Sequence, residues 1–116
     1  MSALSRIKAA LDGFGYPVEP DVYTGDATDR WFTYNYADDR GTKFSDDEPE
    51  ENLVSMQVHH FMPKTVSFTA FKEQVRETLV AQGFEYPAVT AFIDPDSNKR
   101  HLIFEFDGIE DPGEED

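Results

Sequence analysis

The chain has 116 residues, no cysteine, and 24 acidic against 10 basic side chains, so that its formal net charge is −14. The absence of cysteine excludes a disulfide framework, a zinc–thiolate site and a thiol nucleophile. The negative charge repels phosphate groups, so we expect no ordinary binding to DNA or to anionic membranes. The length is typical of a single domain, which we place at residues 1–110, followed by an acidic disordered tail at 111–116.

The first predicted element is a short helix near the N-terminus. Leu4, Ile7 and Leu11 recur at helical spacing, and Gly13 suits the left-handed residue that follows a helix end. The same stretch is too polar for a signal peptide or a membrane span, which favours a protein made in the cytoplasm. The prolines and glycine of residues 16–26 then indicate an extended connector.

Two strands are predicted next, at residues 31–36 and 52–61, because their side chains alternate in polarity. One face of these strands is expected to carry Phe32, Tyr34, Tyr36, Val54, Met56, Val58 and His60. The other face carries Trp31, Thr33, Asn35, Ser55, Gln57 and His59. The acidic residues 38–51 between the strands indicate a solvated loop.

The clearest predicted helix covers residues 67–83. Its apolar stripe consists of Phe68, Phe71, Val75 and Leu79. Ser67 or Thr69 can cap its start, and Gly83 stands where a helix should end. Two more strands, residues 88–93 and 101–106, close the domain, and Leu102, Phe104 and Phe106 share one face of the last strand.

This order of elements predicts an α+β fold. We expect a mostly antiparallel sheet of four to five strands with the two helices packed on one face. The other face and the sheet edges have no cover within one chain, so neighbouring copies of the protein are expected to cover them.

Residues 94–105, DPDSNKRHLIFE, contain part of the pattern of an EF-hand calcium loop. Asp94, Asp96, Asn98 and Glu105 occupy its positions one, three, five and twelve. Position six requires glycine but is Lys99 here, and the flanking segments are predicted strands rather than helices. We therefore predict a turn between two strands, with no bound calcium.

The three histidines are candidate metal ligands. His59 and His60 are adjacent on a strand, so they face opposite sides and do not share a metal ion. His59 or His60 could pair with His101 across the sheet, with a carboxylate completing the site, as in a small hydrolase or metal protein. Because no ligand motif or catalytic signature accompanies them, we predict ordinary sheet residues, no enzyme, no metal and no cofactor.

Two regions are candidates for contact with a partner. The first is the acidic segment, in which we single out Phe44, Asp46, Asp47, Glu48, Glu50 and Glu51. The second is Trp31, because it lies on the less apolar face of its strand, where a large aromatic residue is typical of an interface.

A series of short motifs runs through nearly the whole chain, from about residue 4 to residue 110. These motifs are GFGYPV, VYTGDATDRWFTYNY, LVSMQVHHFMPK, FKEQVRETLVAQGF and DPDSNKRHLIFEF. In this layout the chain resembles the small tail-terminator, or tail-completion, proteins of long-tailed bacteriophages with flexible, non-contractile tails. None of the motifs is a catalytic signature, so the likeness lies in the pattern of elements.

The resemblance implies a structural virion protein. Proteins of this kind form a ring, usually a hexamer, on the head-proximal end of the tail tube, where they contact the major tail tube protein and the head–tail connector protein. DNA would pass through the ring without being bound, and the protein would be assembled in the host cytoplasm without any membrane. The alternative is an acidic inhibitor that mimics DNA and binds a nucleic-acid-binding protein, although its carboxylates gather in two irregular segments.

Overall fold

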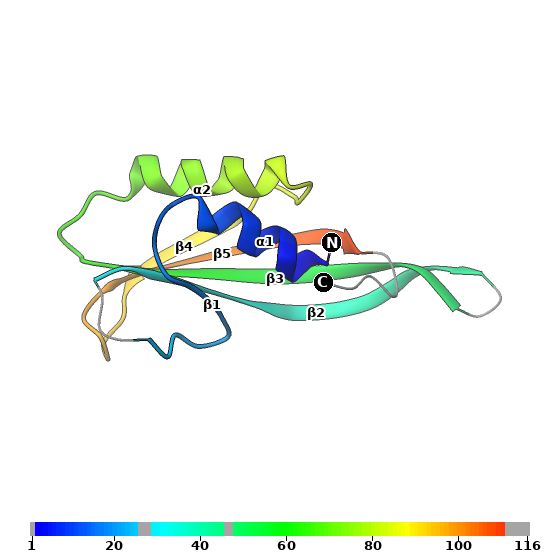
Figure 1. Ribbon diagram of the computed structural model, residues 1–116, viewed down its shortest axis with the longest axis horizontal. Coiled ribbons are helices and arrows are strands. Elements are labelled where there is room, and N and C mark those ends of the chain that lie inside the picture. Colours follow the sequence, from blue (N-terminus) through cyan, green and yellow to red (C-terminus); the bar gives the residue numbers. More distant parts are fainter. Residues whose placement is uncertain (1, 26–28, 46–47, 111–116) are drawn as a thin grey trace.

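The computed structural model describes residues 2–25, 29–45 and 48–110, which form two helices and a five-stranded sheet. In chain order the elements are α1 (Ala3–Asp12), β1 (Val18–Pro20), β2 (Trp31–Ser45), β3 (Glu48–Met62), α2 (Thr69–Ala81), β4 (Ala88–Ile93) and β5 (Arg100–Glu110). The strand order is β1-β2-β3-β5-β4, and every neighbouring pair is antiparallel except β1 with β2 (Figure 1). The predicted α+β class is confirmed.

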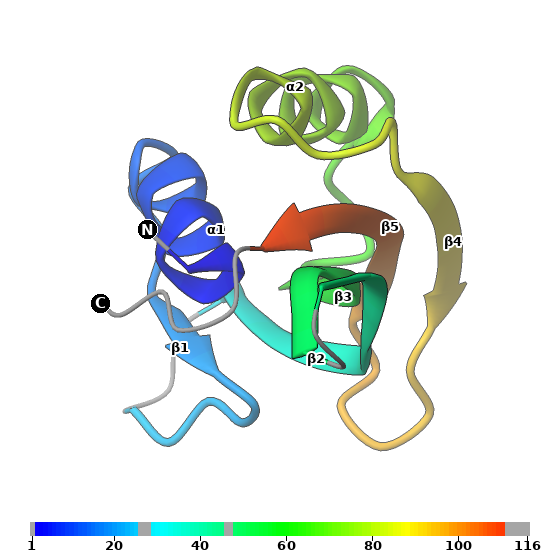
Figure 2. The same ribbon diagram turned by 90° about the vertical axis from the view of Figure 1, so that its right-hand side faces the viewer.

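Both helices lie on the same side of the sheet (Figures 1 and 2). The sheet face beneath them, here called the covered face, carries buried Phe32, Tyr34, Val54, Met56, Val58, His60, Leu102, Phe104 and Phe106. The helices contribute buried Ile7, Leu11, Val75 and Leu79 to the same core. Each of these larger apolar side chains stabilises the fold by about 1.5–3 kcal/mol relative to its exposed state. The predicted stripes and alternation are confirmed.

The ends of the helices differ from the sequence prediction in two places. Gly13 has a right-handed φ of −66°, and the left-handed residue is Gly15, with φ of 83°. The chain therefore makes one further turn of hydrogen bonds, from the Phe14 N–H to the Leu11 carbonyl, before it reverses. Gly83 does adopt a left-handed φ of 93° after α2, as predicted.

The start of α2 has no side-chain cap. Its N-cap residue is Phe68, and neither Ser67 nor Thr69 caps the helix. The prediction of a capping hydroxyl was therefore wrong. Phe68 instead packs against the core, and the guanidinium of Arg100 lies 4.8 Å from the centre of its ring. The start of α2 thus packs against the core through an aromatic side chain and has no hydroxyl cap.

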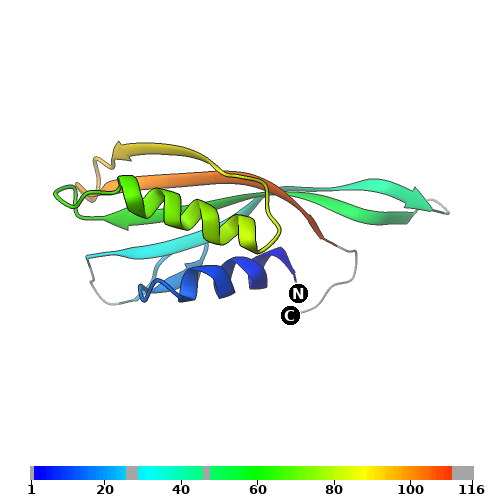
Figure 3. The same cartoon turned by 90° about the horizontal axis from the view of Figure 1, so that it is seen from above.

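The predicted acidic loop at residues 38–51 is wrong, because most of this segment is strand. β2 and β3 have 15 residues each and pair as far as Ser45 with Glu48. β5 pairs with β3 only up to Asn52, so residues 41–45 and 48–51 form a two-stranded hairpin arm beyond it. Figure 3 shows this arm extending past both helices, and the molecule measures 54 × 26 × 26 Å. Three register shifts along β2 and β3 are of the kind that increases strand twist.

A single carboxylate joins the base of the hairpin arm to the helical layer. Glu110, the last residue of β5, accepts hydrogen bonds from the Ala3 backbone N–H at 2.6 Å and from the Tyr36 hydroxyl at 2.8 Å. A negative charge at the first turn of α1 is favourable, because the free N–H groups there carry partial positive charge. This contact marks where the two-layer body ends and the arm begins.

The predicted connector at residues 16–26 contains a short strand. β1 pairs in parallel with β2, from Val18 opposite Phe32 to Pro20 opposite Tyr34. Asp21 then adopts a left-handed φ of 63°, and its N–H donates to the Tyr34 carbonyl at 2.9 Å. This turn carries the chain onto the sheet face that the helices leave uncovered, which positions the site described next.

Within the described residues, neither helix is long and apolar enough to cross a bilayer. The predicted acidic tail at residues 111–116 lies outside the described residues.

Candidate functional site on the open face of the sheet

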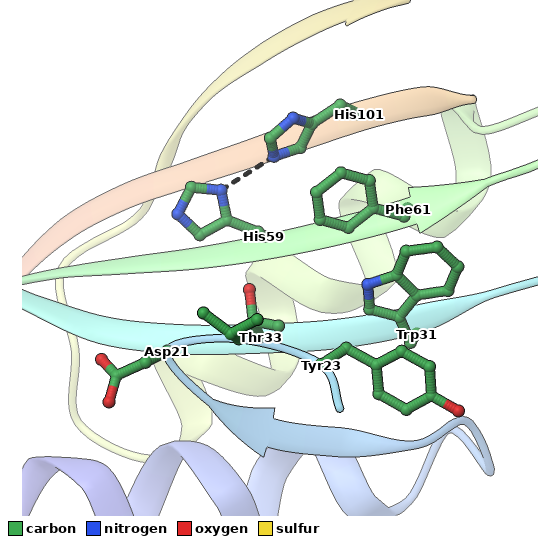
Figure 4. A pocket seen from close by; sticks show the side chains of 8 residues that line it. Asp21, Tyr23, Trp31, Thr33, His59, Phe61 and His101 are labelled. Carbon is green, nitrogen blue, oxygen red and sulfur yellow. Dashed lines mark hydrogen bonds between the residues drawn. The ribbon is translucent and has the colours of Figure 1, made fainter. Parts of the chain in front are cut away.

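The sheet face opposite the helices is here called the open face. It carries Trp31, Thr33, Asn35, Ser55, Gln57, His59, Phe61, His101, Ile103 and Glu105. At one end of this face lies a hollow of about 380 Å³, lined by Asp21, Val22, Tyr23, Trp31, Thr33, His59, Phe61 and His101 (Figure 4). Thr33 is only 5% exposed although it belongs to the open face, in keeping with its place beside the segment from Asp21 to Tyr23.

A row of aromatic rings crosses the open face beside the hollow. In spatial order this aromatic row is Tyr23, Trp31, Phe61, His101 and Phe92, and it runs from the segment after β1 across β2, β3 and β5 to β4. Successive ring centres are 5.1, 5.0, 4.1 and 4.8 Å apart, and the first three pairs are stacked. Stacked rings form a large and rigid contact surface.

Two histidines from neighbouring strands meet on the wall of the hollow. His59 Nδ1 of β3 lies 2.8 Å from His101 Nε2 of β5 (Figure 4). The register places His101 opposite Phe61, so His59 and His101 are diagonal neighbours on one face. Of the two pairings considered from the sequence, the structure contains that of His59 with His101.

Both rings of this histidine pair are neutral at pH 7. Partial burial lowers the pKa of His59, although the charge of Glu105 acts in the opposite direction. Burial, reinforced by the neighbouring His59, lowers the pKa of His101 to about 4, against a raising influence from Asp94. In a neutral pair, one of the two facing nitrogens carries a proton and donates it, and the other accepts through its lone pair. One nitrogen lone pair therefore always lies between the rings.

His60 has a different environment, because it points into the core on the covered face. It is fully buried, and the Arg30 Nε–H donates to its Nε2 at 3.2 Å. The ring centres of Phe32 and Phe71 lie 4.3 and 4.6 Å from that of His60. Burial, together with the positive charge of Arg30, lowers the pKa of His60 to about 3. His60 is thus a core residue that does not belong to the hollow.

The segment that resembled part of an EF-hand is a turn between β4 and β5, as predicted. The Asp94 carboxylate accepts from the Ser97 hydroxyl at 2.8 Å, and the Asn98 N–H donates to the Asp94 carbonyl at 2.8 Å. Glu105 is exposed on β5, beside Gln57 and away from the turn. Among the residues that the structure describes, no three His, Asp or Glu side chains gather as a metal site.

The predicted contact residues lie in two separate places. Phe44 belongs to β2 and Glu48, Glu50 and Glu51 belong to β3, all on the hairpin arm, whereas Asp46 and Asp47 lie outside the described residues. Trp31 is in the aromatic row, at the opposite end of β2. At about 3.3 Å per residue, the length of β2 separates the two places by roughly 45 Å.

The sequence interpretation named Trp31, Thr33, His59 and His101 but missed the other four residues that line the hollow. The alternation of side chains that places His59 on the open face also places Phe61 there, so Phe61 could have been found from the sequence. Tyr23 and Asp21 had no such signal, because their position depends on the left-handed turn at Asp21 and on the pairing of β1.

Comparison with known proteins assigns this chain to no family. No protein-family model matches the sequence, and no curated protein matches it. The likeness to phage tail terminators therefore rests on the sequence motifs.

Proposed function

We propose that this chain is a structural protein of the phage virion, a tail terminator that forms a ring on the head-proximal end of the tail tube. The hairpin arm is the observation that carries this proposal. Residues 48–51 of the arm pair with β2 alone, because β5 pairs with β3 only up to Asn52, the partner of Gly41. A two-stranded ribbon is marginally stable in water by itself, and its outer backbone groups are available for pairing. Such an arm is expected to lie against a neighbouring subunit or a tube protein.

The separation of the two contact regions supports ring formation. A subunit in a closed ring contacts one neighbour on each side through two different surfaces. The hairpin arm and the aromatic row lie at opposite ends of β2, in a molecule 54 Å long. Each region can therefore bind a different neighbour at the same time. The expected number of six subunits comes from the resemblance alone.

The charge of the arm fits the passage of DNA. Asp38 and Asp39 lie on β2 before the arm, and the sequence of the arm itself is rich in acidic residues. Carboxylates near the lumen of a ring would repel the phosphates of a passing DNA molecule and keep it from binding. The tail tube protein and the head–tail connector protein are the proposed partners, and the virion tail is the proposed location.

The test is the assembly state of the purified full-length protein, alone and with the tail tube protein of the same phage. We expect annular particles in negative-stain microscopy and a mass several times that of one chain. The variant D46S/D47S/E48S should lower the yield of joined, infectious particles. A matched control, D29S/E77S/D96S, removes three carboxylates outside the arm and should leave assembly unchanged.

Two outcomes would contradict the proposal. One is a protein that stays monomeric at all concentrations and in the presence of the tube protein, with unaltered infectivity of the arm variant. The other is salt-sensitive, stoichiometric binding to a basic nucleic-acid enzyme, which would indicate a DNA mimic instead.

A further inference from the structure

We propose that His59 and His101 form a two-nitrogen binding site for a divalent transition metal ion, with Cu²⁺ preferred, on the wall of the hollow. This site lies apart from the hairpin arm, although His101 also belongs to the aromatic row, and it departs from the expectation, drawn from the sequence, that the protein binds no metal.

The hydrogen-bond separation of the two nitrogens is also the separation of neighbouring ligands in one coordination geometry. His59 Nδ1 and His101 Nε2 lie 2.8 Å apart. Two neighbouring ligands of a square-planar or tetragonal ion, each about 2.0 Å from the metal and at a right angle, are also about 2.8 Å apart. In a tetrahedral zinc site the corresponding separation is about 3.3 Å. Cu²⁺ and Ni²⁺ adopt the tetragonal geometry with nitrogen ligands, and Cu²⁺ binds more strongly.

Binding requires no movement of the strands. The histidines are held on β3 and β5, whose register continues on both sides of them from Asn52–Glu110 to Met62–Arg100. Their hydrogen bond already points two nitrogens toward each other. Exchange of the tautomer moves the shared proton to the outer nitrogen of the donating ring, and a small rotation of both rings then directs the two free lone pairs at an ion.

The remaining coordination positions face open space. The histidine pair lines a hollow of about 380 Å³, which has room for the water molecules that complete the coordination of the ion. Within the described residues no third His, Asp or Glu joins the pair. A site with two protein ligands and open positions binds an exchangeable ion and is not a closed structural metal centre.

The surroundings favour a cation. Glu105 lies on the open face and its charge acts on His59, while the charge of Asp94 acts on His101. The whole chain carries a formal charge of −14, which raises the local concentration of divalent cations.

The chain offers no competing imidazole or thiolate ligands. It has three histidines and no cysteine, and the third histidine, His60, is fully buried beneath Arg30. Imidazole coordination of Cu²⁺ by the folded protein can therefore come only from His59 and His101. This makes the proposal directly testable by spectroscopy.

The experiment titrates the 116-residue protein with Cu²⁺ at neutral pH in the presence of citrate, an oxygen-donor ligand that competes for weakly held ions. We expect one ion per chain, with splitting from two imidazole nitrogens in the electron paramagnetic resonance spectrum. H59Q and H101Q should each weaken Cu²⁺ binding by about a hundredfold or more. The loss of a residue that only hydrogen-bonds to a metal ligand already weakens binding by about tenfold to a hundredfold. The double variant should lose the nitrogen signal.

Two controls separate this site from binding by surface carboxylates. D39N removes an exposed carboxylate elsewhere on β2 and should bind Cu²⁺ as the unaltered protein does. In the unaltered protein, Cu²⁺ should broaden the NMR signals of Phe61 and Ile103 before those of Ile7 and Leu11, which lie on the opposite side of the sheet. This measurement does not depend on the folding of any variant.

The proposal is overturned by a spectrum with oxygen ligands only, by equal binding to H59Q/H101Q, or by broadening that is not centred on the histidine pair. None of these results bears on the hairpin arm, on which the ring proposal rests.

Discussion

His59 and His60 are consecutive residues with opposite environments, and they represent the two faces of the sheet. His60 lies under the helices, fully buried among rings and beneath Arg30. His59 lies on the open face, half-buried, with a second imidazole at hydrogen-bonding distance and a hollow beside it. The same side chain thus contributes to the core at one position and to a potential binding surface at the next.

The difference between the two faces comes from what covers them. On the covered face, alternate residues of all the long strands meet two helices and form one core. On the open face, the short segment from Asp21 to Tyr23 lies beside the sheet, and neither helix covers it. Tight packing makes the covered face sensitive to any change of volume, whereas the open face has room for ligands and partners.

The largest contrast is expected between two phenylalanines. Phe104 is fully buried on the covered face, so F104A should lower the free energy of unfolding by about 3–5 kcal/mol. F61A removes a half-buried ring from the open face and should cost only about 1–2 kcal/mol. Urea unfolding of both variants measures the difference. Equal losses would mean that the two faces are equally well packed.

Acid should destabilise the protein through His60. Its pKa is about 3 in the folded state and about 6.5 when unfolded, so between these values only the unfolded chain binds the proton. The free energy of unfolding should therefore fall as pH drops below 6.5, by on the order of 3 kcal/mol at pH 4 from this residue alone. Above pH 6.5 both states are neutral and the effect vanishes.

The variant H60L isolates this contribution. It removes the titrating group, so the loss of stability between pH 6.5 and 4 should become smaller than in the unaltered protein. The free energy of unfolding of H60L should still fall with pH because of His59 and His101, whose pKa values are also lowered in the folded state. Thermal unfolding at several pH values measures both proteins, and identical slopes would show that His60 is not buried in its neutral form.

A smaller loss is expected where the covered face has no room for a methyl group. A Cβ at Gly108 would lie 2.6 Å from Cδ1 of Phe84, whose ring packs on Phe106 and under the guanidinium of Arg6. G108A should therefore cost about 1–3 kcal/mol. A88V adds two methyl groups at an exposed position of β4 and should stay within about 0.5 kcal/mol. Denaturant midpoints compare the two, and a neutral G108A would show that Phe84 can move aside.

The smallest predicted effect concerns the open face. The Lys99 ammonium lies 5.8 Å from the centre of the Trp31 ring, a cation–π contact worth about 0.5 kcal/mol at an accessible site. K99Q should reduce stability by this amount, and more so at low salt. K64Q, which removes a lysine that bonds only to the Asn98 side chain, serves as the control. An equal change in both variants would assign the effect to net charge.

The faces of the sheet could be predicted from the sequence, because burial of one face makes apolar and polar side chains alternate along each strand. Val54, Met56 and Val58 have to point to the helices, and Gln57 and His59 then have to point away. The helical stripe ending in Val75 and Leu79 is equally clear. These patterns exist because each element packs against another.

The hairpin arm could not be predicted in this way. No helix covers it, so its strands show no apolar alternation, and its charges and glycine resemble those of a loop. β1 was missed because it has three residues, one of them a proline. The hollow was missed because it depends on the left-handed turn at Asp21, a conformation that only a few residue types adopt readily.

Trp31 is the only tryptophan of the chain, and it stacks between Tyr23 and Phe61 beside the hollow. Its intrinsic fluorescence is therefore a natural reporter that needs no label. An ion held by the histidines would quench its emission, and a neighbouring subunit on the aromatic row would shift the emission to shorter wavelength. Tryptophan fluorescence can thus follow both metal binding and subunit association in the unmodified protein.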